Sequence, residues 1–413
     1  MEYHKNGGVR LKTIENGTIT SVAGFKAAAV NCRIKDNDKN DLGLIVGEKK
    51  NICVGVFTQN MVRSKTIDLS IKNIENNNIK AIIVNSGNAN ACVGQKGYND
   101  ALKMTELIAD ELNIKKEEVV VASTGVIGQE LPMEKIEKGI KEISKHLKKD
   151  GGEEVAKAIM TTDLVPKNIA VDIKLENGKI VRIAGIAKGS GMIHPNMATM
   201  LGFITTDMNI KKEVLQDLLR EITNKTFNMI SVDRDTSTND MVIVLANGMA
   251  ENEEVKDENS LDYEEFKKGL YYVMEYLAKS IARDGEGATK LIEVQVDNAS
   301  SFDDAKKVGK SVINSPLVKT AIYGEDANWG RIIAAVGYSG ATVSEAEIDI
   351  FVGDIQVCKN GIGVLESEEE VNKILKTDEI KIKIDLKLGV ERAKVWGCDL
   401  TYDYIKINAD YRS

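Results

Sequence analysis

The alternation of apolar and polar positions predicts strands and helices that are mixed along most of the chain. Short β-branched or apolar runs are typical of buried strands, and they occur at 79–84, 118–122 and 200–204. Apolar residues at helical spacing predict helices at 98–112, 131–147, 215–222 and 266–281. Because both kinds of element are mixed throughout, we expect an α/β or α+β fold in which layered sheets carry outer helices.

The length of the chain predicts two domains, since 413 residues exceed what one compact core usually holds. Between 380 and 388, isoleucine and leucine alternate with lysine and aspartate, which is typical of a strand with one solvated face. We predict a catalytic core at 1–290, to which a tail at 396–413 returns. A smaller α/β domain is predicted at 291–395.

The composition favours a cytoplasmic protein that binds neither nucleic acid nor a membrane. Lysine and glutamate are interspersed and the net charge is −8, so no nucleic-acid or membrane surface is predicted. The five cysteines form no C-x-x-C pair, and the sequence has neither a signal-peptide pattern nor a long apolar run. No metal-ligand spacing is present, and a histidine-based triad would have to use His194. We therefore expect no metal site.

The segment 188–201 holds the most informative local pattern. Ala198 directly precedes Thr199, and the apolar run that follows is the predicted strand at 200–204. A threonine placed there can attack its own preceding carbonyl and cut the chain. The new N-terminal threonine would then carry both a nucleophilic hydroxyl and an α-amine that accepts its proton. The alternative is an ordinary loop that enters a core strand.

Two polar turns and a lysine contain further candidate residues for catalysis and substrate binding. The Thr124 hydroxyl beside the Gly125 N–H at a strand end makes a plausible oxyanion hole; a turn that simply needs glycine is the alternative. The hydroxyls and carboxylate of 161–163 can hold an amino-acid ligand, or they end a helix. Lys188, eleven residues before Thr199, can pair with a substrate carboxylate.

Three later segments have both a functional and a structural interpretation. The polar stretch 231–240 can flank an active site or form a solvated turn. Glu286 follows Gly285, the predicted capping glycine of a helix, and it either meets a substrate ammonium or belongs to a simple helix end. The last residues, 404–413, keep an apolar alternation that would suit a tail tucked into a site, although most termini fray.

Taken together, these segments resemble the arginine-biosynthesis ornithine acetyltransferase (glutamate N-acetyltransferase) family nearly end to end. The matching segments are 24–28, 56–60, 84–92, 123–125, 160–163, 188–192, 195–201, 231–233, 235–240, 328–331 and 404–413. The family usually has glycine at the position of Arg234, which puts the local turn geometry in doubt, and a common threonine at the position of Met241. Neither difference removes a catalytic group.

The resemblance implies a self-processing, N-terminal-nucleophile-type acyltransferase. Cleavage between Ala198 and Thr199 would give an α chain, 1–198, and a β chain, 199–413. Thr199 would be the nucleophile, and Thr124 and Gly125 would form the oxyanion hole. The implied substrate contacts, with the choice between the first two left open, are Thr161, Thr162, Lys188, Thr199, Glu286, Asn408 and Ser413.

The implied reaction moves an acetyl group from N2-acetylornithine to L-glutamate through an acetyl-Thr199 intermediate, without metal or cofactor. The α and β chains would associate as an α2β2 heterotetramer. The sequence leaves open whether acetyl-CoA is a second donor, which would make the enzyme bifunctional as an amino-acid N-acetyltransferase. Two alternatives remain at this point: a related self-cleaving aminopeptidase or amidase that uses water, and an uncut, non-enzymatic ligand-binding protein.

Overall fold

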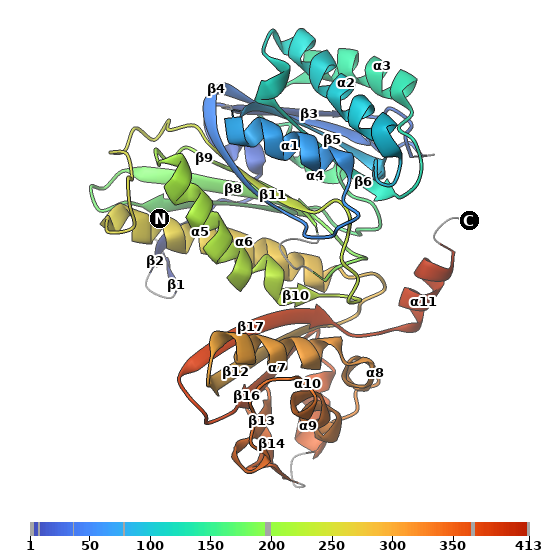
Figure 1. The fold of residues 1–413 in the computed structure, drawn as a ribbon. Helices are drawn as coiled ribbons and strands as arrows, with labels where there is room; N and C mark the ends of the chain where they lie inside the picture. The colour runs from blue at the N-terminus through green and yellow to red at the C-terminus, as the bar shows by residue number, and fades with distance from the viewer. Residues whose placement is uncertain are drawn as a thin grey trace. The chain divides into compact units, whose positions relative to one another are not determined.

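The computed structural model describes residues 4–6, 9–35, 37–76, 79–194, 200–364 and 368–410. The chain divides into two compact units (Figure 1). Unit 1 comprises Met1–Gly189, Asn196–Asn224 and Thr236–Leu277, and unit 2 comprises Ser190–Pro195, Lys225–Asp235 and Ala278–Ser413. The sequence predicts a catalytic core at 1–290, to which 396–413 belongs, and a smaller domain at 291–395. These domain boundaries stay a prediction.

Unit 1 is built on one large sheet, which has ten strands among the described residues. Nine of them lie in the order β1 (His4–Asn6), β2 (Val9–Thr13), β7 (Lys167–Lys174), β8 (Ile180–Lys188), β9 (Leu201–Thr206), β11 (Met241–Ala246), β4 (Leu42–Phe57), β5 (Ile79–Asn88) and β6 (Val119–Val126). The tenth, β3 (Phe25–Val30), pairs with β4 in antiparallel fashion.

The long strand β4 belongs to both halves of this sheet. Its first part, 42–46, pairs with β3 and β5, and its last part, 52–57, pairs with β11. The register shifts between Val46 and Asn51, and the residues at 48–50 are exposed. A break in the ladder at an exposed, charged stretch lets one strand turn from one half of the sheet into the other.

The two halves of the sheet share one core, and a second core lies on the outer face of β3–β6. Successive residues of a strand point to opposite faces, and β5 follows this rule: Ile82 and Val84 join the shared core, whereas Ala81 and Ile83 join the outer one. The shared core also contains Phe203 of β9. Both faces of these strands are therefore buried, which explains their nearly continuous apolar sequences.

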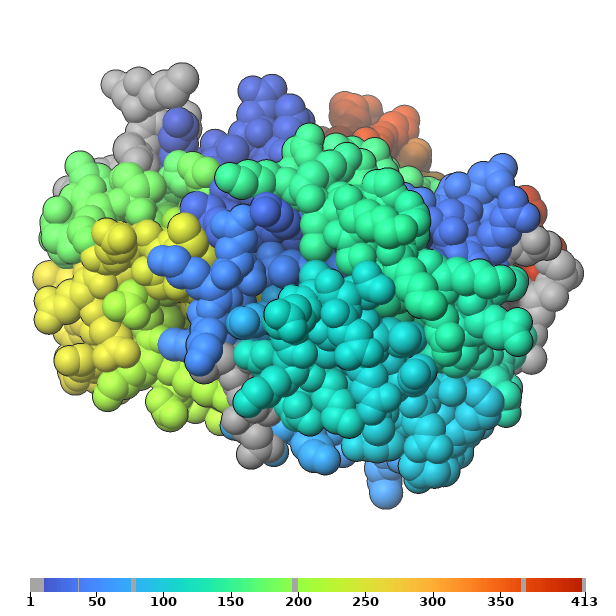
Figure 2. Space-filling view, turned by 90° about the horizontal axis from the view of Figure 1, so that it is seen from above, coloured from blue at the N-terminus to red at the C-terminus, as the bar shows by residue number. Residues whose placement is uncertain are grey.

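Helices cover the outer faces of unit 1. They are α1 (Lys65–Asn76), α2 (Gly94–Leu112), α3 (Met133–Ile143), α4 (Gly152–Ala158), α5 (Lys212–Lys225) and α6 (Leu261–Arg283). Apolar residues of α2 and α3 pack on the outer core, and the same helices form much of the surface seen in Figure 2. On the other half, Gly269 of α6 lets the helix approach Ile173 and Ile183 closely.

Unit 2 has a second sheet with helices packed on it. Its strands lie in the order β10 (Ile230–Ser231), β17 (Glu391–Cys398), β12 (Leu291–Ala299), β16 (Glu379–Asp385), β13 (Asp349–Val352), β14 (Ile355–Lys359) and β15 (Ile362–Gly363). Its helices are α7 (Phe302–Asn314), α8 (Pro316–Tyr323), α9 (Trp329–Gly337), α10 (Glu368–Leu375) and α11 (Tyr402–Ala409). The fully buried Trp396 anchors the sheet, and its Nε1–H donates to Glu293 at 2.7 Å.

The predicted α/β class with layered sheets and outer helices is confirmed. The predicted strands correspond to β5, β6 and β9, and the alternating stretch near 380 is β16. The predicted helix at 131–147 is shorter, because α3 ends at Ile143 and a 3-10 turn follows. Residues 402–409 of the tail form helix α11. Within the described part of the chain, no helix combines the length and the apolar character needed to cross a membrane.

Replacement of Phe203 by alanine should lower the free energy of unfolding by about 3–5 kcal/mol, because it opens a cavity in the shared core. Phe203 is fully buried. Urea unfolding followed by circular dichroism measures the loss. Met61→Ala is the control, since Met61 is 98% exposed and its truncation should change stability by no more than about 0.5 kcal/mol. Equal effects of the two substitutions would contradict the core assignment.

Candidate active site

The predicted oxyanion turn lies at the end of β6 in unit 1. Thr124 is nearly buried, with 8% of its surface exposed. Gly125 has a φ of 135°, and a Cβ atom there would lie 2.3 Å from the carbonyl carbon of Gly87. Position 125 therefore tolerates only glycine, for both conformational and steric reasons. The glycine brings β6 against the end of β5 and fixes the backbone next to the Thr124 hydroxyl.

A buried amide, Asn239, supports this turn from the polar stretch 231–240. Its side-chain nitrogen donates to the carbonyls of Ala89 at 2.6 Å and Ser123 at 2.8 Å. The Ser123 hydroxyl in turn donates to the Asn85 side chain at 2.6 Å. The backbone on either side of the candidate oxyanion hole is thus held by buried hydrogen bonds, which suits a site that must be rigid.

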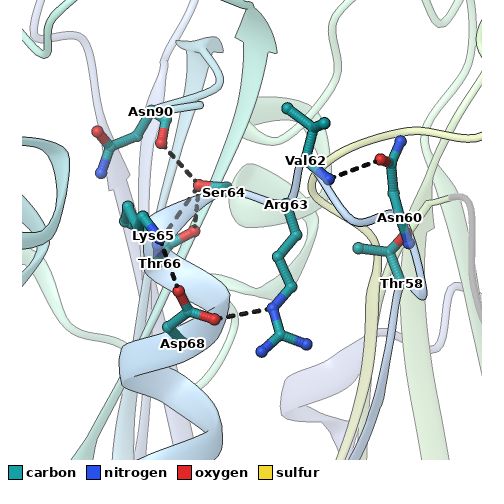
Figure 3. Close-up of polar contacts among 9 residues, drawn as sticks. All are labelled: Thr58, Asn60, Val62, Arg63, Ser64, Lys65, Thr66, Asp68 and Asn90. Atoms are coloured by element: carbon teal, nitrogen blue, oxygen red, sulfur yellow. Dashed lines mark hydrogen bonds and ion pairs between the residues drawn. The ribbon is translucent and has the colours of Figure 1, made fainter. Parts of the chain in front are cut away.

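The loop between β4 and α1 packs on the same polar stretch. The Ser64 N–H donates to the Thr238 carbonyl at 2.8 Å, and the Ser64 hydroxyl donates to the Asn90 carbonyl at 2.9 Å. Figure 3 shows the contact between Ser64 and Asn90 and, beside it, Asp68 of α1, which accepts a hydrogen bond from Arg63 at 2.8 Å. Within the family-like segment 56–60, the Thr58 hydroxyl donates to the Ser237 carbonyl at 2.9 Å, so this segment supports the same polar stretch.

Asp163 is the central buried charge of unit 1. One carboxylate oxygen accepts from Lys167 Nζ and from the Gly189 N–H, both at 2.7 Å, and the other accepts from the Thr161 N–H at 3.0 Å. Burial alone would raise the pKa of Asp163, but the nearby ammonium groups of Lys188 and Lys167 and these hydrogen bonds lower it to about 2. Asp163 is therefore ionised at neutral pH.

Lys188 joins the two predicted hydroxyl turns. It ends β8 with only 7% of its surface exposed. Its Nζ donates to Thr161 Oγ1 at 2.8 Å and, more weakly, lies 3.4 Å from Thr124 Oγ1. Because the ammonium is the donor, Thr124 keeps its own hydroxyl proton for donation to another group. The structure thus brings Thr124, Thr161 and Lys188 together.

A second buried carboxyl group, Asp240, lies near Lys188 and was not singled out from the sequence. Burial raises its pKa well above the ordinary value, against the opposing effects of Ser237, Lys188, the Met200 N–H and Thr58. Its Oδ2 atom has no hydrogen-bond partner in the described part of the chain. The pKa of Asp240 is therefore raised and that of Asp163 lowered, although both carboxyl groups are buried.

Unit 2 contains the predicted Glu286 and Asn408. Glu286 is 7% exposed and accepts a hydrogen bond from the Asn408 side chain at 2.8 Å. Its carboxyl lies directly over Gly191, where a Cβ atom would approach within 2.3 Å. The Thr401 side chain, which caps α11, donates to the Gly287 carbonyl at 2.7 Å. The helix of the tail is therefore fixed to the loop that carries Glu286.

Asp233 holds the segment 190–194 in unit 2. Its carboxylate accepts from the N–H groups of Met192 at 2.6 Å and Ile193 at 2.8 Å. The next residue, Arg234, has a φ of 72°, a left-handed conformation that glycine adopts without strain. The turn at this position therefore has a conformation typical of glycine, although the residue is arginine. Burial, together with Lys310, Arg234 and Lys306, lowers the pKa of His194 to about 4, so its imidazole is neutral.

Three predicted site residues, Ala198, Thr199 and Ser413, lie outside the described residues. Their roles, and the cleavage between the first two, stay predictions. No cluster of histidine, cysteine or acidic residues within the described ranges is arranged to hold a metal ion. The segment 328–331 begins α9, where the Asn328 side chain caps the helix.

The Thr124 hydroxyl lies beside the Gly125 N–H, and the buried Lys188 lies next to Thr124. This arrangement is suited to acyl transfer. The family model described as the ArgJ family matches residues 26–413, so the chain belongs to the ArgJ family. The family membership expected from the sequence is thereby confirmed.

Two relatives match nearly the whole chain. The arginine biosynthesis bifunctional protein ArgJ 1 of Clostridium acetobutylicum is 52% identical over 407 residues, which cover 98% of this chain and 99% of that protein. The corresponding protein of Thermotoga neapolitana is 50% identical over 396 residues, covering 94% and 99%. In the crystal structure of the bifunctional protein from Bacillus halodurans, the match is 54% identical and covers 51% of this chain and 98% of that chain, with a TM-score of 0.49.

Asp163→Asn should destabilise the protein by about 3–5 kcal/mol, because Lys167, which is 2% exposed, would lose its carboxylate partner.

The stability that the wild-type pair of Asp163 and Lys167 provides should also depend on pH. The folded pKa of Asp163, about 2, lies below its unfolded value of about 3.9, so the stabilisation is complete above pH 4 and is lost as the pH falls towards 2. Urea unfolding at pH 7, 4 and 3 measures both effects.

The exposed Asp150 provides the matched control for this comparison. Asp150→Asn should leave stability within about 0.5 kcal/mol of wild type. If Asp163→Asn and Asp150→Asn unfolded at the same urea concentration at pH 7, Asp163 would not be the central buried charge described above.

Proposed function

We propose that this chain transfers the acetyl group of N2-acetylornithine to L-glutamate, releasing ornithine and forming N-acetylglutamate. The observation that carries the proposal is the group of three polar residues in unit 1, in which the Lys188 ammonium contacts the hydroxyls of Thr161 and Thr124 beside Gly125. Membership of the ArgJ family supports an enzyme of arginine biosynthesis rather than a binding protein.

Maturation begins, in this proposal, when Thr199 Oγ attacks the Ala198 carbonyl carbon. The peptide bond becomes an ester by an N-to-O shift, and water then opens the ester. This leaves a carboxylate on Ala198 and a free α-amine on Thr199. The α chain, 1–198, and the β chain, 199–413, stay associated, and we propose an α2β2 assembly in the cytoplasm.

Turnover uses the new amine as the base. A terminal amine has a pKa of about 8, close enough to neutral pH to accept the Thr199 hydroxyl proton. The hydroxyl attacks the acetyl amide, and the Thr124 hydroxyl and the Gly125 N–H stabilise the oxyanion. The proton passes to the leaving nitrogen of ornithine. The amine of glutamate then attacks the acetyl-Thr199 ester, which restores the threonine hydroxyl.

The remaining residues hold the amino-acid portions of the substrates. Lys188, supported by Thr161 or Thr162, pairs with the α-carboxylate. Glu286 accepts the ammonium of the ornithine side chain, and its carboxyl is oriented for this by Asn408. Ser413 completes the set of proposed contacts. Because the relatives are named as bifunctional proteins, acetyl-CoA is the second donor that we propose.

Incubation of the purified protein with acetylornithine and glutamate should release ornithine and N-acetylglutamate in equal amounts. Intact-mass analysis should show a fragment that begins at Thr199. Thr199→Ala should abolish both cleavage and transfer, since no other group supplies the nucleophile. Release of acetate without dependence on glutamate would instead identify an amidase, and an active but wholly uncut protein would refute the N-terminal nucleophile.

Thr124→Ala should lower kcat by roughly 10²–10³-fold, because it removes one oxyanion donor. The KM for acetylornithine should change much less, since the donor acts in the transition state. Steady-state kinetics of the cleaved variant provide the test, with Thr20→Ala, a buried threonine elsewhere in unit 1, as control. An unchanged kcat with a large increase in KM would assign Thr124 to ground-state binding.

A further inference from the structure

A short loop of unit 1 presents a lysine that the proposed mechanism does not use. The Asp41 carboxylate, fully buried, accepts from the backbone N–H groups of Cys32 at 2.7 Å, Ile34 at 2.6 Å and Lys35 at 3.1 Å. Because one carboxylate gathers these donors, the backbone of the loop is fixed. The position from which the Lys35 side chain starts is therefore well defined.

The Lys35 side chain reaches the segment that carries the candidate substrate hydroxyls. A Cβ atom placed on Gly87 would lie 2.7 Å from the Lys35 Cγ. The aliphatic part of the Lys35 side chain therefore packs over the end of β5, where Gly87 lies. Its Nζ donates to the Met160 carbonyl at 3.1 Å. In the part of the chain that the structure describes, no carboxylate lies within ion-pair distance of this half-buried ammonium.

Lys35 and Lys188 contact consecutive residues. Lys188 donates to Thr161 Oγ1 and Lys35 to the carbonyl of Met160, and the Cα atoms of neighbouring residues are only about 3.8 Å apart. Burial lowers the pKa of Lys35, as do the charges of Lys39 and Lys188, whereas Asp41 and Asp163 oppose the change. A carboxylate beside Lys35 would thus offset both the desolvation and the repulsion.

We propose that Lys35 forms a subsite for the side-chain carboxylate of a dicarboxylic amino acid, while Lys188 takes its α-carboxylate. The inference rests on the proposed function, in which glutamate is the acetyl acceptor. Two ammonium groups that donate to the adjacent residues Met160 and Thr161 match a ligand with two carboxylates. The same positive charge repels the side-chain ammonium of ornithine, for which Glu286 is the proposed partner. Lys35 is therefore the residue that selects the acceptor.

Lys35→Met should raise the KM for glutamate by roughly 10- to 100-fold, the range expected for loss of a hydrogen bond between charged groups. The first half-reaction, the burst of ornithine from acetylornithine, should keep its rate, because the donor has no second carboxylate. Rapid-quench measurement of the two half-reactions separates these effects. Lys39→Met, which removes an exposed lysine of the same loop, should leave both half-reactions unchanged.

The choice of acceptor gives a readout that a purely structural role would not alter. Wild-type enzyme should prefer glutamate to glutamine, Lys35→Met should lose that preference, and Lys35→Arg should recover part of it. In the wild type, glutarate should compete with glutamate and butyrate should not, a test that needs no variant. The subsite is refuted if glutamate KM stays normal in Lys35→Met, if both half-reactions slow equally, or if butyrate competes as well as glutarate.

Failure of the proposed function can be distinguished from failure of this subsite. If the proposed function is wrong, the wild type itself will release no ornithine from acetylornithine, whatever the acceptor. A wild type with a normal ornithine burst and no preference for dicarboxylates would keep the proposed transfer reaction and remove only the role of Lys35.

Discussion

The arrangement of unit 1 depends on the buried Asp163 carboxylate. Its three hydrogen-bond donors come from separate segments: Lys167 begins β7, Gly189 follows β8, and Thr161 follows α4. A charge in a dry interior is tolerated only when it is paired and fully hydrogen-bonded. The requirement to satisfy this one carboxylate therefore fixes three pieces of backbone at once, and it places Thr161 where Lys188 can reach it.

The layered sheet explains why residues so distant in sequence meet. Thr124 ends β6 in one half of the sheet, and Lys188 ends β8 in the other. The halves are continuous through β4 and share a core, so the ends of their strands come together at one edge, where the two side chains lie 3.4 Å apart. Gly125 permits this close packing because no side chain fits between β6 and the end of β5.

The sequence predicts the strands and helices and the hydroxyl turns because these depend on local periodicity and on residue types that favour turns. The glycine that the family usually has at position 234 put the turn geometry there in doubt, but the positive φ of Arg234 was not predicted. The supporting partners were not predicted. Asn239 bonds to Ala89 and Ser123 across more than a hundred residues, and such pairs follow from the fold rather than from any local pattern.

Burial acts on the carboxyl groups of Asp163 and Asp240 in the same direction, and their pKa values differ because the groups around them differ. Asp163 faces two ammonium groups and has a lowered pKa, whereas Asp240 leaves Oδ2 without a partner among the described residues and has a raised pKa. A raised pKa favours the uncharged form of Asp240 and so reduces the negative charge that this carboxyl group places near Lys188. The Lys188 ammonium therefore keeps more of its attraction for the carboxylate of an amino acid.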